Sequence, residues 1–505
     1  MMIFSISSFA QKMNCSTQHT TEFMKRLEKN VANSFAEKAG VARYIPVELH
    51  LVSDNDGSND VDEDEILSKM CILNERYADI EMHFYVTGVN KIANTVLNHR
   101  PQTQSSQSVM RNSKNPNAMN IFLVDEILTF DNQSQSFVPS GAAGYYSGGG
   151  NDYIVMLQTT PGDEGYTMEH EIGHHFSLAH THVGWEGDLS DSSPDAIQGY
   201  VPEVHGDTVR IEIITGSTQA PPTAVELVDG SNCSTAGDRI CDTPPDYGFG
   251  QACSCCTMRF DVWDRNGDKI EPMIDNIMSY SQFCDEMFFT DGQKDAMYED
   301  FDSPFRSHLR VGQVNQYTPI TEEVAVTAPT VGQKYDSFDG VLVEWNAVQH
   351  AERYVVNISG GQQIRYETTD TELYIEDLQA SSLYFVEVRA FNKFGTGCQG
   401  SNRIFFETGA GSTSTNETES INQINVYPNP IKSSENLVIE YNSNKNIDSK
   451  IRLHNLQGKV VELINTTFAA GNNNFKIDTK SLVSGLYILE IETAEGIISE
   501  KIIVE

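Results

Sequence analysis

One short segment, residues 169–180, limits what this chain can fold into more than any other. Its sequence is Glu-His-Glu-Ile-Gly-His-His-Phe-Ser-Leu-Ala-His, and it holds four of the 13 histidines of the chain. On a helix, residues i and i+4 share one face, so His170 and His174 can present two imidazoles to one metal ion. An unbroken helix would turn His180 away from that ion. The pattern therefore predicts a helix that ends in a sharp turn near Ser177.

Three neutral imidazoles with one position left for water are typical of a catalytic zinc site rather than a closed structural one. Glu171 stands beside the first imidazole, where a carboxylate can act as general base on a metal-bound water. We therefore predict that His170, His174 and His180 bind zinc and that Glu171 is catalytic. A surface helix that is merely rich in histidine is the alternative, and it leaves the position of Glu171 unexplained.

The histidine pattern resembles the extended zinc signature of the metzincin metallopeptidases, with Ser177 where that signature has glycine. A left-handed turn there costs a non-glycine residue roughly 1–2 kcal/mol. The family also has a methionine turn beneath the zinc, and residues 275–280, Asp-Asn-Ile-Met-Ser-Tyr, resemble one. Together with segments 237–245 and 284–293, this order of motifs resembles the pappalysin-like (cytophagalysin) branch of the metzincins over residues 45–309.

The resemblance implies an α+β catalytic domain over residues 45–310, with a twisted mixed sheet, an active-site helix and zinc in a cleft. It implies that Met278 forms an apolar floor and that Tyr280 hydrogen-bonds the oxyanion, although a packing role for Tyr280 is the alternative. It makes calcium a second expected ion, in the loop around Asp242 and Thr243. The sequence Asp-Arg-Asn-Gly-Asp that begins at residue 264 also faintly resembles a calcium loop, and an ordinary Asn-Gly turn is the other explanation.

The residues ahead of that domain are interpreted as export and latency segments. Residues 1–10 resemble the end of a signal peptide, and a plain disordered terminus is the alternative. Residues 11–44 are expected to be a pro-segment, with apolar residues at helical spacing from Phe23 onward. The triplet 15–17, Cys-Ser-Thr, resembles the Cys-Gly-Thr of related pro-segments. That resemblance implies that Cys15 caps the zinc in a zymogen, and an ordinary free cysteine is the alternative.

Apolar periodicity predicts the elements of the catalytic domain. The glycine-rich segment 141–150 has no helix after it, which argues against phosphate binding. By resemblance it forms the edge strand above the cleft, to which an extended peptide can pair, and a flexible hairpin loop is the alternative. The expected elements are strands at 45–51, 82–86, 121–124 and 153–157, helices at 65–79, 167–176 and 293–309, and a long polar insertion at 183–232.

Cysteine content and charge limit the setting. Six of the nine cysteines lie between Cys233 and Cys284, which suggests disulfides and an oxidising compartment. We expect Cys284 to pair with Cys253, Cys255 or Cys256, and a second zinc site at those three is the alternative. The net charge of -37 disfavours nucleic acid and anionic membranes as partners. No run of 18 apolar residues occurs, so no membrane span is expected.

The C-terminal part replaces helical patterns with strand-like alternation. Residues 320–408 resemble a fibronectin type III sandwich with Trp345 and Tyr384 in its core, and a carbohydrate platform is the alternative role for these rings. Residues 409–422 are expected to be a flexible linker. Residues 423–505, which contain Val-Tyr-Pro-Asn-Pro, resemble the C-terminal sorting domain of type IX secretion. A generic β-module is the alternative. The catalytic domain is thus expected to precede two all-β sandwiches.

These motifs predict a secreted or cell-surface zinc-dependent endopeptidase that acts on proteins or peptides and uses the type IX secretion machinery. Zinc would act as a Lewis acid, and Glu171 would take a proton from water and deliver it to the leaving amine. A surface adhesin or carbohydrate-binding protein on an inactive metzincin scaffold is the alternative from another class. A metal-dependent hydrolase of a non-peptide bond is a third.

Overall fold

The computed structural model divides into two compact units. Unit 1 is Met1–Thr318 with Lys393–Gly395, and unit 2 is Pro319–Asn392 with Thr396–Glu505. The structure describes residues 14–33, 41–159, 165–183, 208–210, 222–224, 226–247, 264, 266–280, 284, 286–338, 340–396, 403–409, 421–432, 435–455, 460–480, 482–493 and 496–504. The expected signal-peptide remnant and most of the expected insertion and linker lie outside these residues.

Unit 1 is built on a six-stranded mixed sheet. Four neighbouring strands, β8, β4, β2 and β3, run parallel, and β7 runs antiparallel to β8. A short strand from the N-terminal segment, β1, pairs in parallel with β7. The expected strands are therefore confirmed, and within the glycine-rich segment residues 142–147 form a strand while residues 148–150 form the turn after it. In order across the sheet they are β1 (Asn14–Cys15), β7 (Ala142–Ser147), β8 (Tyr153–Leu157), β4 (Met119–Val124), β2 (Arg43–Ser53) and β3 (Met82–Ala93).

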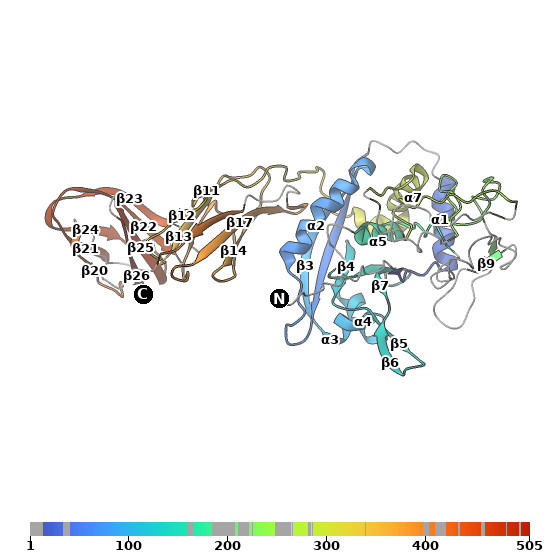
Figure 1. Ribbon diagram of the computed structural model, residues 1–505, viewed down its shortest axis with the longest axis horizontal. Helices are drawn as coiled ribbons and strands as arrows, with labels where there is room; N and C mark the ends of the chain where they lie inside the picture. The colour runs from blue at the N-terminus through green and yellow to red at the C-terminus, as the bar shows by residue number, and fades with distance from the viewer. Residues whose placement is uncertain are drawn as a thin grey trace, which may run out of the picture. The chain divides into compact units, whose positions relative to one another are not determined.

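Helices cover both faces of this sheet, with α5, α7 and α1 on one side and α3 and α4 on the other (Figure 1). Strand β4 is buried at every residue, as its largely apolar sequence favours, and its one polar residue, Asn120, is hydrogen-bonded. Two small hairpins complete the unit. The helices are α1 (Thr21–Asn33), α2 (Glu63–Arg76), η1 (Ala78–Ile80), α3 (Thr95–His99), α4 (Gln104–Ser113), α5 (Thr167–His175), α7 (Asp291–Asp302) and η4 (Pro304–Arg310), and the hairpins are β5 (Leu128–Asp131) with β6 (Ser136–Pro139) and β9 (Thr208–Arg210) with β10 (Pro222–Ala224).

The single helix expected over 293–309 was wrong. Helix α7 ends at Asp302, and a separate 3-10 helix begins at Pro304. Proline disfavours helical backbone in the residue before it, and Ser303 is accordingly extended, with φ of -65° and ψ of 159°. The start of α7 is fixed by a capping box between Thr290 and Gln293.

Unit 2 contains a sandwich of two sheets that matches the expected all-β character of residues 320–408. Trp345 and Tyr384 are both buried in its core. The Tyr384 hydroxyl accepts a hydrogen bond of 2.7 Å from the backbone N–H of Gln379, five residues upstream. The burial of both rings rules out the carbohydrate platform. One sheet is β11 (Val326–Ala328), β13 (Val341–Trp345) and β16 (Glu372–Ile375), and the other is β12 (Gln333–Lys334), β19 (Ile404–Glu407), β17 (Leu383–Asn392), β14 (Arg353–Gly360) and β15 (Ile364–Thr368), with β18 (Gly395–Thr396) beside β17.

A second sandwich in unit 2 has its own apolar core, which includes Leu437, Leu453, Phe468 and Leu489. Its first strand begins at Ile421, two residues before the predicted domain start. One sheet is β20 (Ile421–Tyr427), β21 (Asn436–Ser443) and β24 (Gly471–Asp478), and the other is β23 (Val460–Phe468), β22 (Ile447–Asn455), β25 (Gly485–Thr493) and β26 (Gly496–Val504).

Candidate metal centre

Three histidines meet in unit 1 through the same ring nitrogen. The Nε2 atom of His174 lies 3.1 Å from Nε2 of His170 and 3.1 Å from Nε2 of His180. Two nitrogens bound to one tetrahedral zinc ion at about 2.05 Å would lie about 3.3 Å apart. All three side chains are almost completely buried. The predicted ligands therefore come together at the spacing that a zinc ion needs.

The tautomers of these rings give an independent test of the fit. Nδ1 of His170 lies 2.7 Å from the carbonyl oxygen of Ile277, and Nδ1 of His174 lies 2.7 Å from that of Leu178. A carbonyl oxygen only accepts hydrogen bonds, so each Nδ1 carries the ring proton. Each Nε2 is therefore unprotonated and presents a lone pair. Two lone pairs 3.1 Å apart cannot hydrogen-bond to each other. A shared cation satisfies both.

Burial also keeps these rings neutral, as metal ligands must be. It lowers the pKa of His170 to about 4 and holds the pKa values of His174 and His180 well below their usual range. A buried imidazolium would lose its hydration, so the uncharged form is favoured.

The turn that the sequence predicts after the helix is present. Helix α5 ends at His175, and Ser177 has a left-handed backbone with φ of 75°. The N–H of Leu178 then donates to the carbonyl of Gly173 at 2.9 Å, which closes the helix end. This reversal brings His180 back toward α5.

Glu171 lies between the metal site and strand β7. It is 1% exposed, and burial raises its pKa to about 8. A Cβ atom on Gly144 of β7 would lie 3.1 Å from Cγ of Glu171, so a larger residue would require the strand or the carboxylate to shift by a few tenths of an ångström. The edge of the sheet and the predicted general base are thus neighbours.

Met278 and Tyr280, which the family resemblance singled out, both lie close to the histidine cluster. Met278 is fully buried under α5, and a Cβ atom on Gly173 would be only 2.5 Å from its sulfur. The N–H of Met278 donates to Oδ1 of Asn276 at 2.9 Å, which holds the turn. The ring centroid of Tyr280 is 4.7 Å from that of His180.

The N-terminal segment covers this site with alternate residues. Ligand atoms of Cys15 and the three histidines all lie within 4.8 Å of one another. The Thr17 hydroxyl donates to Oε2 of Glu171 at 3.1 Å and accepts from the N–H of Tyr146 at 2.8 Å. Nε2 of His19 accepts from the N–H of His180 at 3.3 Å.

Sequence reasoning singled out Cys15 and missed the other two residues. Cys15 also exchanges hydrogen bonds with Tyr280, whose hydroxyl donates to its carbonyl at 2.9 Å and accepts from its N–H at 3.3 Å. The two-residue spacing of Cys15, Thr17 and His19 could have indicated that all three face the metal site, since alternate residues of an extended chain face the same way.

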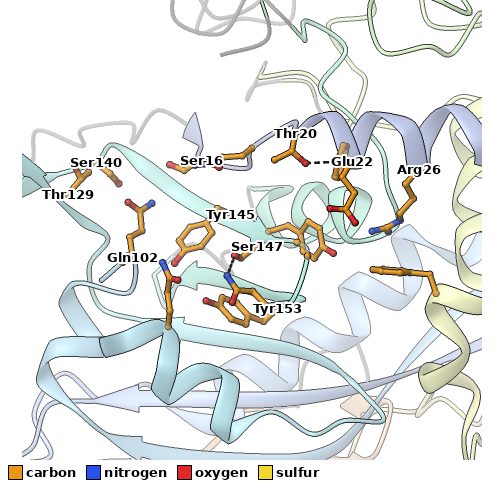
Figure 2. Close-up of a pocket in the computed structure, with 18 residues that line it drawn as sticks. Ser16, Thr20, Glu22, Arg26, Gln102, Thr129, Ser140, Tyr145, Ser147 and Tyr153 are labelled. Atoms are coloured by element: carbon orange, nitrogen blue, oxygen red, sulfur yellow. Dashed lines mark hydrogen bonds between the residues drawn. The ribbon is translucent and has the colours of Figure 1, made fainter. Parts of the chain in front are cut away.

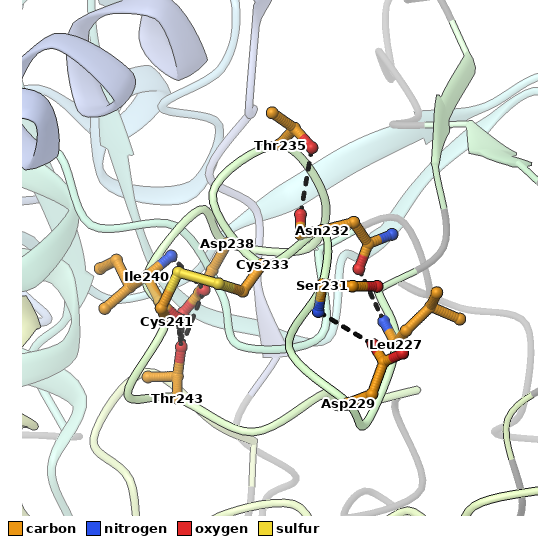
Figure 3. Close-up of a disulfide and its surroundings, with 10 residues drawn as sticks. All are labelled: Leu227, Asp229, Ser231, Asn232, Cys233, Thr235, Asp238, Ile240, Cys241 and Thr243. Atoms are coloured by element: carbon orange, nitrogen blue, oxygen red, sulfur yellow. Dashed lines mark hydrogen bonds between the residues drawn. A yellow bond between two sulfur atoms is a disulfide. The ribbon is translucent and has the colours of Figure 1, made fainter.

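A disulfide between Cys233 and Cys241 closes a short loop (Figure 3). The next residue, Asp242, accepts from the Thr290 hydroxyl at 2.8 Å and from the N–H of Gly292 at 2.7 Å, so the loop caps α7. Cys71 and Cys284 each form a disulfide as well. The partner predicted for Cys284, one of Cys253, Cys255 and Cys256, lies outside the described residues.

The calcium candidates already accept hydrogen bonds from the chain. The Thr243 hydroxyl donates to the carboxylate of Asp238, whose pKa burial raises to about 7. Asp264 accepts from the N–H groups of Asn266, at 2.8 Å, and Asp268, at 3.0 Å, as an Asn-Gly turn requires. Calcium in either loop remains a prediction.

Comparisons with known proteins identify the C-terminal end. Residues 425–505 match the family model described as secretion system C-terminal sorting domain. The protein is therefore secreted or displayed at the cell surface. The match agrees with the type IX export domain predicted for residues 423–505, and it suggests the type IX machinery as a partner. No helix within the described residues is both long and apolar enough to cross a membrane.

The solved structures found to be similar share low identity and low TM-scores with this chain. The curated proteins give no match. Similar solved structures include the FN1–FN3 domains of chicken CNTN1, at 15% identity and a TM-score of 0.18 over 38% of this chain and 70% of that one. A structure titled FN3tt mut has 20% identity and a TM-score of 0.13 over 16% and 93% of the two chains. A third, titled Myokine structure, has 17% identity and a TM-score of 0.15 over 18% and 99%.

Proposed function

We propose that this protein is a secreted zinc-dependent endopeptidase, made as a precursor whose N-terminal segment blocks its own site. The observation that carries the proposal is the pair of Nε2 lone pairs on His170 and His174, which face each other at 3.1 Å. His180 supplies a third nitrogen, and Glu171 lies beside them as a buried carboxylate. A binding scaffold needs no such carboxylate.

Zinc held by the three histidines would supply Lewis acidity and make a bound water more acidic. Glu171 takes the proton of the attacking water and returns it to the leaving amine, acting from its buried position beside the histidines. The Tyr280 hydroxyl, which now bonds to the backbone of Cys15, becomes the donor to the oxyanion when that segment leaves. The edge of β7, which now pairs with β1, receives an extended substrate.

In this proposal, two contacts at the site keep the precursor inactive. The Cys15 thiol occupies the position that water needs, as its grouping with the three histidines supports. The Thr17 hydroxyl engages the carboxylate that must act as base. Only about 10 Å³ of space remains between Cys15, Glu171 and Tyr280, which is about the size of one water probe.

The test compares three variants of the full chain after the same activation treatment. Glu171→Gln should keep one zinc per chain and lose at least the roughly 10²–10⁴-fold in turnover that a general base supplies. His174→Ala should lose both zinc and activity. Glu169→Gln is the matched control, because Glu169 lies on the same helix but pairs with Arg76 at 2.9 Å, away from the metal site.

Zinc content and cleavage of gelatin are the two readouts. Parental turnover by Glu171→Gln would disprove the mechanism. A parent that holds zinc and cleaves no unfolded protein after removal of the N-terminal segment would favour the adhesin alternative.

A further inference from the structure

Arg26 of helix α1 fills a slot in unit 1 that is built for a guanidinium group. Its Nε donates to Oδ1 of Asp300 and its Nη2 to Oδ2, both at 2.6 Å. The same Nη2 donates to the carbonyl oxygen of His175 at 2.6 Å. Its Cζ lies 4.4 Å from the centre of the Phe305 ring.

This combination selects arginine over lysine. Two parallel hydrogen bonds to one carboxylate need the fixed fork of a guanidinium, and an ammonium group cannot reproduce them. The flat face of the group also stacks on an aromatic ring. The Asp300 carboxylate is fully buried, so both bonds form away from water, where they are strong.

Arg26 is one of two guanidinium groups in the charge cluster around the slot. Asp300 and Asp152 are bridged by the fully buried Arg306, which lies 3.1 Å from the first and 2.7 Å from the second. Two carboxylates therefore face two guanidinium groups while Arg26 is in place. Without Arg26 they face one, and a buried carboxylate that loses its partner is strongly disfavoured.

Arg26 also lines a cavity whose lining includes neither the three histidines nor Glu171. This cavity, of about 630 Å³, is lined by Ser16, next to Cys15, and at its other end by Arg26 and Phe305. Its floor carries Tyr145 and Tyr153, and Arg26 reaches into it from α1 (Figure 2). The size is within the range of ligand pockets. The lining residues that carry full charges, Glu22 and Arg26, both belong to α1 and would leave with it.

We propose that the slot is a guanidinium-binding subsite, which takes an arginine side chain of the protein substrate once the N-terminal segment has left. Arg26 would then be a built-in mimic of that side chain. The binding of a guanidinium stands on the contacts of Arg26 alone. Its assignment to a substrate rests on the proposed endopeptidase function.

The first experiment tests binding in the full chain and needs no catalysis. Arg26→Ala should leave the slot open, and N-acetyl-arginine amide should then raise the melting temperature of the variant in a saturable way. A rise on the order of 3 °C is expected at ten times the Kd. The matched variant is Lys25→Ala, since Lys25 is the exposed neighbour on α1 and leaves the slot filled.

Three controls decide the outcome. The neutral isostere N-acetyl-citrulline amide should raise the melting temperature of Arg26→Ala much less, and neither compound should shift the parent or Lys25→Ala. Adding Asp300→Asn to Arg26→Ala should abolish the shift. Equal effects of the arginine and citrulline compounds, or no shift with either, would overturn the proposal.

The second experiment tests the assignment to substrate. Peptides carrying one arginine, placed at successive distances from the cleaved bond, are compared with citrulline peptides on the processed chain. One position should favour arginine at least tenfold in kcat/KM, and Asp300→Asn should bring that ratio toward one. A ratio near one at every position would refute the substrate assignment. Arginine binding in a chain that cleaves no peptide would refute the peptidase function but would still support the slot as a guanidinium-binding site.

Discussion

Replacing Gly173 with alanine should destabilise this protein, although a glycine-to-alanine change inside a helix usually stabilises a protein. Gly173 lies inside α5, where alanine is normally better than glycine by about 0.5–1 kcal/mol. The new Cβ atom, however, would lie 2.5 Å from Sδ of Met278 and 3.4 Å from its Cε. Two such atoms prefer about 3.5–4.0 Å, so the contact is more than about 1 Å too short.

This steric overlap decides whether the substitution stabilises or destabilises the protein. Met278 is fully buried, so its side chain cannot swing into solvent to make room. Overpacking of this kind costs about 1–3 kcal/mol, which exceeds the gain in helix propensity. A net loss of about 1–2 kcal/mol remains, and for a unit of this size it corresponds to a fall in melting temperature of about 1.5–3 °C.

Calorimetry of the full chain measures this shift, and a double-mutant cycle assigns it. In a Met278→Ala background, Gly173→Ala should become neutral or stabilising, because the sulfur it meets is gone. Gly150→Ala is the control, since a Cβ there meets nothing within 4 Å and should change stability little. If Gly173→Ala stabilises the parent as it stabilises Met278→Ala, then Met278 does not pack beneath this helix.

Three further predictions concern latency and export. Cys15→Ser should give a precursor that cleaves gelatin without prior processing, and a variant as inert as the parent would show that the thiol is not the lock. Thr17→Val keeps the shape of the side chain but removes its hydrogen bonds to Glu171 and Tyr146. Each bond is worth about 1–3 kcal/mol when a charged or buried group is left unpaired. The precursor should therefore be activated at a lower protease concentration, which the rate of appearance of activity measures. A chain that ends at Gly409 should retain its activity in vitro and fail to be exported, since the matched sorting region begins only at residue 425; loss of activity with zinc still bound would contradict this.

The sequence alone determined the local geometry of the site. The spacing of His170 and His174 places them on one helical face because the helix repeats every 3.6 residues. The position of His180 required a reversal of the chain, and Ser177 supplies it with a left-handed backbone. Local alternation predicted the all-β character of residues 320–408, whereas the burial of Trp345 and Tyr384 was expected from the resemblance to a fibronectin type III sandwich.

Tertiary structure alone decided the contacts between distant segments. Arg26 meets Asp300, 274 residues away, and Thr17 meets Glu171, 154 residues away. No periodicity connects such residues, because their encounter depends on how α1, α7 and β7 are packed rather than on the preferences of either segment. The pairing of Cys233 with Cys241 was likewise open among six clustered cysteines until the loop was folded. Patterns repeated along the chain fix the elements and the ligands that share one element, whereas the latency contacts and the guanidinium slot exist only where separate elements meet.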